Sequence, residues 1–189
     1  DTGLHRINFR LSNNKETFIL FECIHNLRDL IDKRAETIIK FQFNEDVNSP
    51  GFCGIFPIDL QTKKSMLSPD VGNCQQAGTG EITASALIVL YKNIVNPNIE
   101  EIKKIELYTN KWLREKCQDE NYACYLNPLN KIIGGDGMGF RIWIANWLST
   151  IYYYLSLIED RYLTLQTRDT YLLWAYDTLK WFFSNKPTY

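Results

Sequence analysis

The spacing of apolar residues along the chain predicts a mostly helical protein. From Asn13 onward, apolar side chains recur every three or four positions as far as Phe43, which is the spacing of one buried stripe on an amphipathic helix. Asn13 and Glu16 resemble a capping box at the start of this helix. The same spacing predicts four further helices, over residues 79–94, 99–116, 138–160 and 169–185. Asn98 and Thr167 are the expected N-caps of the third and fifth helices.

Three segments do not follow the helical spacing. Residues 4–10 alternate between apolar and polar side chains, which is typical of a short edge strand or an extended arm. Residues 44–78 and 118–137 are rich in glycine and other turn-forming residues. Loops as long as the first of these are usually functional or disordered, and its apolar side chains favour a packed segment.

The predicted helices form a repeat in which an amphipathic helix is followed by a more apolar one. We therefore expect a single all-α domain of antiparallel helix pairs, stacked as a partial α/α toroid with long irregular glycine-containing loops. Its parts are an N-terminal arm (1–12), a first helix pair (13–94), a second pair (98–160) and a final helix of a possibly truncated unit (167–185). Such units bury their apolar faces against neighbours, so a partner protein or a second copy is expected to complete the stack.

Two short motifs carry a resemblance to a known repeat. The run Gly-Glu-Ile-Thr-Ala-Ser-Ala-Leu at residues 80–87, together with Ile102 and the Trp112-Leu113 pair, resembles the prenyltransferase and squalene-oxidase repeat. This resemblance implies the toroid shared by terpenoid cyclases and prenyltransferase β-subunits. Similar helix pairs occur in six-hairpin glycosidases and polysaccharide lyases. The chain lacks the Asp-x-Asp-Asp motif of the cyclases, and its two histidines, His5 and His25, do not match the prenyltransferase zinc set.

The charge balance argues against two classes of partner. Lysine and arginine number 21 against 22 aspartate and glutamate residues, so no strong field draws the chain to nucleic acid or to a membrane surface. The apolar stretch from Phe140 to Ile158 contains Arg141 and Asn146, which are costly in hydrocarbon. We therefore interpret it as a helix buried in protein.

The five cysteines and two histidines do not form a metal motif, and no cofactor is expected. The cysteines are most simply buried reduced thiols of a cytoplasmic protein, because the first residues are polar and do not resemble a signal peptide. Since the chain begins at Asp1, processing stays possible. In an oxidising compartment Cys53 could bridge to Cys74, and Cys117 to Cys124.

The loop that leads into the helix over 79–94 is the most polar segment. Asp70, Asn73, Gln75 and Glu81 could bind a polar or anionic ligand at the free N–H groups of the helix start, although turn formation explains the same residues. Asp136 precedes the helix over 138–160 in an equivalent position. Asp70, Glu81 and Asp136 are therefore the candidate acid and base of a carbohydrate-active enzyme, either a glycosidase or a lyase.

Two other groupings are candidates for a site. Arg141, Trp143 and Trp147 could line a cavity for a sugar or an apolar ligand, although most aromatic residues at this spacing are core. Cys74 could act as the nucleophile of a cysteine hydrolase with His25 as its base. The sequence favours a non-catalytic module that binds a partner protein or ligand through its glycine-rich loop face, with the two enzymatic functions as alternatives.

Overall fold

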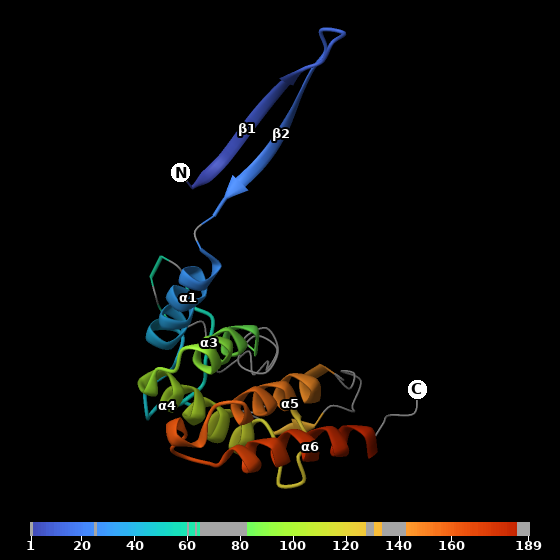
Figure 1. Ribbon diagram of the computed structural model, residues 1–189. Coiled ribbons are helices and arrows are strands. Elements are labelled where there is room, and N and C mark those ends of the chain that lie inside the picture. The colour runs from blue at the N-terminus through green and yellow to red at the C-terminus, as the bar shows by residue number, and fades with distance from the viewer. Residues whose placement is uncertain are drawn as a thin grey trace.

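The computed structural model describes residues 2–24, 26–59, 61–62, 64, 83–127, 131–133 and 143–184. It consists of a two-stranded β-hairpin that projects from a helical part (Figure 1). Within these residues the strands are β1 (Gly3–Arg10), β2 (Glu16–Cys23), β3 (Tyr125–Asn127) and β4 (Ile132–Ile133). The helices are α1 (Leu27–Phe41), α3 (Thr83–Val95), α4 (Ile99–Leu107), the π-helix η2 (Tyr108–Arg114), α5 (Trp143–Ser156), the short 3-10 helix η3 (Asp160–Tyr162) and α6 (Arg168–Ser184). None of the described helices is long and apolar enough to cross a membrane.

The predicted all-α fold class is wrong, because the chain contains antiparallel sheet. β1 pairs with β2 along their whole length, from Gly3 opposite Cys23 to Arg10 opposite Glu16, and β3 pairs with β4 in a second, shorter sheet. The long helix predicted over 13–43 is also wrong. Its first part is strand β2, whose run of apolar residues fits both the helical and the extended period, and only α1 is helical.

The residues taken as a capping box form the hairpin turn instead. Leu11 donates its N–H to Lys15 O at 2.8 Å, and Asn13 Oδ1 accepts the N–H of Lys15 at 3.1 Å. Asn14 has a positive φ of 58°, a conformation that asparagine tolerates in turns. The helix α1 begins later, where Asn26 Oδ1 accepts the N–H of Arg28 at 2.9 Å.

Residues opposite each other across the two strands share a face of the hairpin. One face carries no aspartate, glutamate, lysine or arginine, and we call it the apolar face. Its cross-strand pairs are Gly3 with Cys23, His5 with Phe21, Ile7 with Ile19 and Phe9 with Thr17. The other face carries charges, with the Arg6 guanidinium 4.0 Å from the Phe18 ring centre and Arg10 4.0 Å from Glu16. Ile19 is 56% exposed and Phe21 is 41% exposed, so the described core does not cover the apolar face.

The other four predicted helices are present among the described residues, although α5 ends at Ser156 and not at residue 160 as predicted. Asn98 caps α4, since its Oδ1 accepts the N–H groups of Glu100 and Glu101 at 3.0 and 3.2 Å. Thr167 Oγ1 accepts the N–H of Thr170 at 3.2 Å at the start of α6. Residues 79–82 and 138–142, the expected first turns of two helices, lie outside the described residues.

The core lies where α3 packs against α1, α4 and α5, and where α5 packs against α6 (Figure 1). Its largest fully buried side chains include Trp112, Tyr108, Tyr152, Tyr171 and Phe56. Phe56 meets the Trp112 ring edge-on at 5.2 Å between ring centres, which ties the segment after α1 to η2.

The π-helix η2 follows α4 directly and buries most of its residues. The N–H of Glu115 reaches the carbonyl of Asn110, and that of Cys117 reaches the carbonyl of Trp112 at 3.0 Å. Such turns hold one more residue than an α-helical turn. Neighbours in sequence, Trp112 and Leu113, are therefore both placed in the core.

A buried carboxylate joins α4 to the segment before α6. Glu106 is 0% exposed, and its two oxygens accept five hydrogen bonds. The donors are the N–H groups of Thr164, Leu165 and Gln166, the hydroxyl of Thr164 at 2.8 Å and the hydroxyl of Tyr171 at 2.7 Å. Because these donors replace water around the charge, they hold the segment over 164–166 in one conformation.

We predict that Glu106→Gln lowers the free energy of unfolding by about 2 to 4 kcal/mol, because the amide nitrogen meets N–H donors and several charge-assisted hydrogen bonds are lost. Urea unfolding followed by circular dichroism measures this change. The matched control is Glu115→Gln, whose exposed carboxylate pairs with Lys111 and whose removal should cost less than about 0.5 kcal/mol. Equal effects of the two substitutions would contradict the role given to Glu106.

Alkaline pH should destabilise the fold through a buried thiol. Burial raises the pKa of Cys124 from its ordinary value of 9.0 to about 12. Above about pH 9 the unfolded chain therefore loses this proton while the native chain keeps it, so the stability that is present below pH 9 falls as the pH rises toward 12. Urea unfolding of the wild type and of Cys124→Ser across this range should give a shallower decline for the variant. The same slope in both proteins would refute the assignment.

Candidate functional site

Nearly all of the residues that the sequence singled out lie outside the part of the chain that the structure describes. These are His25, Asp70, Asn73, Cys74, Gln75, Glu81, Asp136 and Arg141, and the side chain of Trp143 belongs with them. Trp147 is the exception, and it lies half-buried on α5. Two proximities therefore stay predictions. One is that of the carboxylates of Asp70, Glu81 and Asp136, and the other is that of Cys74 and His25.

The described cysteines are free thiols. Cys53, Cys117 and Cys124 are buried and Cys23 is exposed, so the alternative bridge between Cys117 and Cys124 is not formed. Burial also raises the pKa of Cys53, which disfavours its reactive thiolate form. Among the described residues, no three histidine, cysteine, aspartate or glutamate side chains gather closely enough to hold a metal ion.

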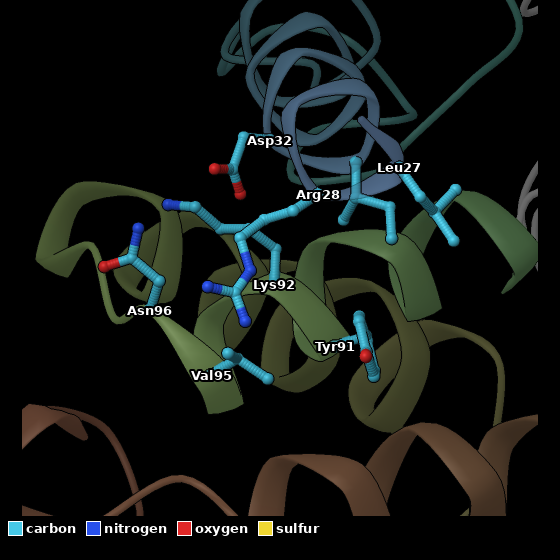
Figure 2. A pocket seen from close by; sticks show the side chains of 8 residues that line it. Leu27, Arg28, Asp32, Tyr91, Lys92, Val95 and Asn96 are labelled. Carbon is cyan, nitrogen blue, oxygen red and sulfur yellow. The ribbon is translucent and has the colours of Figure 1, made fainter. Parts of the chain in front are cut away.

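A cavity among the described residues lies between α1 and α3, and we call it the α1–α3 groove (Figure 2). It has a volume of about 420 Å³. Its lining comes from the first turns of α1 and the last turns of α3, and consists of Leu27, Arg28, Ile31, Asp32, Tyr91, Lys92, Val95 and Asn96. The buried residues of α1, Ala35, Ile38 and Ile39, come later in the helix than the residues that line the groove.

The two ends of this groove differ chemically. Figure 2 shows Leu27 and Tyr91 at one end, with Asp32 and Asn96 at the other. Arg28 reaches from α1 across the middle toward Val95. Its guanidinium makes no ion pair and no side-chain hydrogen bond with the described residues.

The second cation of the groove is already neutralised. Lys92 is buried, and its Nζ lies 3.0 Å from Glu101 Oε2, which also accepts a hydrogen bond from Asn93 Nδ2 at 2.7 Å. Asn93 Oδ1 in turn accepts the N–H of Asn98, so this cluster fixes the turn between α3 and α4. Lys92 therefore supports the groove wall, and Arg28 supplies the cation that a ligand can reach.

The groove continues along α3 into a smaller, apolar hollow. This hollow has a volume of about 220 Å³ and shares Ile31 and Tyr91 with the α1–α3 groove. Leu87 and Ile88 of α3 and Tyr154 of α5 complete its lining. We call it the distal hollow.

A further hollow of about 450 Å³ lies between η2 and the start of α6, but its polar side chains serve the fold. Gln118 donates to Thr178 Oγ1 at 3.0 Å and accepts from the Tyr152 hydroxyl at 2.6 Å. Arg114 donates to the carbonyl oxygen of Asp119 at 2.7 Å. These groups are held by internal partners, so we take the α1–α3 groove as the candidate site.

No pattern in the sequence predicted this groove. Arg28 and Asp32 lie on an amphipathic helix, where exposed charged residues are the ordinary solvated face. Tyr91 lies on a predicted helix as one more aromatic residue. Only the packing of α1 on α3 brings these side chains to one cavity.

Comparisons with solved structures give a likeness in fold. No family model and no curated protein matches the chain. Among solved structures, one described as a polysaccharide lyase superposes with a TM-score of 0.77 at 19% sequence identity. The likeness covers 98% of this chain and 26% of that one, so the chain spans about a quarter of the length of the lyase. This likeness to the lyase does not test the resemblance to the prenyltransferase repeat. The chain is thus similar in fold, hairpin and helices together, to one part of a polysaccharide lyase.

Proposed function

We propose that the chain is the part of a carbohydrate-active protein that binds an acidic polysaccharide in the α1–α3 groove. The observation that carries this proposal is Arg28, a cation without a partner among the described residues, which reaches across a groove that ends in the Tyr91 ring. The name of the structurally similar lyase supports a polysaccharide as the ligand class. The Arg28 guanidinium in the groove supports a polysaccharide that carries carboxylate groups.

Each part of the groove has a counterpart on a uronic acid. A guanidinium offers parallel N–H donors that match a carboxylate, which makes arginine well suited to recognise the sugar acid. Asp32 and Asn96, at the polar end, can accept and donate hydrogen bonds to sugar hydroxyls. Tyr91 is 52% exposed and presents a ring against which the apolar face of a sugar can pack.

This proposal keeps the ligand-binding role that the sequence favoured and moves it from the glycine-rich loop face to the α1–α3 groove. It assigns no catalytic role to a described residue. Asp70, Glu81 and Asp136 stay the predicted acid and base if the whole protein is an enzyme. A protein partner or second copy that completes the helical stack also stays a prediction.

The test is a calorimetric titration of the chain with trisaccharides of glucuronic, galacturonic and mannuronic acid, each beside its neutral hexose counterpart. At least one acidic sugar should bind more tightly than its neutral counterpart. Arg28→Gln should lower that affinity about tenfold, which corresponds to about 1.4 kcal/mol, and leave binding of the neutral sugar unchanged.

The matched control is Arg34→Gln, which removes an exposed cation of the same helix that does not line the groove. It should leave the affinity unchanged. Equal loss in the two variants would mean that only net charge matters. Failure of every acidic sugar to bind more tightly than its neutral counterpart would refute the proposed function.

A further inference from the structure

The distal hollow restricts what can lie beside the sugar ring. Ile31, Leu87 and Ile88 are aliphatic and offer no hydrogen-bonding group, so a sugar hydroxyl placed against them would lose its water without a replacement. Burial of an unpaired hydroxyl is unfavourable, whereas burial of a methyl or methylene group is favourable. The hollow therefore suits an apolar group.

The distal hollow is continuous with the site around Arg28. Ile31 and Tyr91 line both cavities, so a ligand whose carboxylate meets Arg28 can extend past the Tyr91 ring without leaving the protein surface. The hollow is small, about 220 Å³ against about 420 Å³ for the groove, and Tyr154 of α5 also lines it. It has room for a small substituent, and three of its five lining side chains, those of Ile31, Leu87 and Ile88, are aliphatic.

We infer that the polysaccharide bound in the α1–α3 groove carries short O-acyl substituents, and that the distal hollow binds the acyl group. This inference rests on the proposed function, and it names the class of acidic polysaccharide. The carboxylate pairs with Arg28, the sugar ring packs on Tyr91, and the acyl chain contacts Leu87 and Ile88. The ester is a recognition element, and no covalent step is involved.

The experiment compares two forms of the uronic acid trisaccharide that binds best, one carrying an O-acetyl group and one deacetylated with alkali. The wild type should bind the acetylated form about fourfold more tightly, the gain expected from burying one methyl group. Ile88→Thr, which replaces a methyl-bearing branch with a hydroxyl, should remove this preference and leave the affinity for the deacetylated form unchanged. Arg28→Gln should weaken both forms equally.

Two further variants make the test specific. Tyr154→Trp enlarges a side chain that lines the hollow and should also remove the preference, which guards against a folding defect in Ile88→Thr. Leu173→Thr changes an exposed aliphatic residue of α6 that does not line the hollow, and it should keep the preference. Thermal unfolding checks that each variant is folded.

The outcomes separate this inference from the proposed function. Tighter binding of the acetylated form that is lost in Ile88→Thr and Tyr154→Trp supports the inference. Equal binding of the two forms by the wild type overturns it and leaves the proposed function standing. A preference that survives both variants overturns the assignment to the distal hollow, and failure of both sugars to bind overturns the proposed function as well.

Discussion

Glu106 is a buried carboxylate that pairs with no lysine or arginine among the described residues, and N–H and O–H donors stabilise its charge instead. They come from the backbone over 164–166 and from the Tyr171 hydroxyl. The hydrogen bonds around Glu106 also connect α6 to other helices. Tyr171 also accepts a hydrogen bond from Asn110 Nδ2 at 2.9 Å, which ties α6 to the π-helix η2. Since α6 packs on α5 and α5 packs on α3, the position of the helix that forms one wall of the groove follows from this cluster.

The spacing of apolar residues correctly predicted the helices whose apolar stripes face the core. The prediction failed where that spacing fits both a helix and a strand. In the run of β2, Phe18 and Phe21 lie three positions apart, which fits a helix, yet every residue between them is also apolar and fits a strand. Asn13 and Asn14 separate two such runs, which is a hairpin signal as much as a helix cap. The pairing of β1 with β2 decided between these readings, and pairing is not visible in one strand alone.

The groove was beyond prediction for a different reason. Its walls come from helices that are distant in sequence, and its exposed lining residues obey the ordinary rule that polar side chains face solvent. Lys103, Lys104 and Lys111 each pair with a glutamate, and what distinguishes Arg28 from an exposed cation such as Arg34 on the same helix is that it lines the groove. Such a difference is a property of the folded surface. The predicted loop residues, from Asp70 to Glu81 and at Asp136, lie outside the described residues.

The π-helix has a consequence for how this chain should be aligned with others. Since an α-helical turn has 3.6 residues, removing one residue from η2 would rotate all that follows by about 100° about the helix axis. Trp112 would then lose its ring contact with Phe56, and Gln118 would lose its hydrogen bond from the Tyr152 hydroxyl. A relative with a regular α-helix here must therefore differ by a compensating change in the segment that follows. An alignment with such a relative should therefore place a one-residue gap within Tyr108–Arg114.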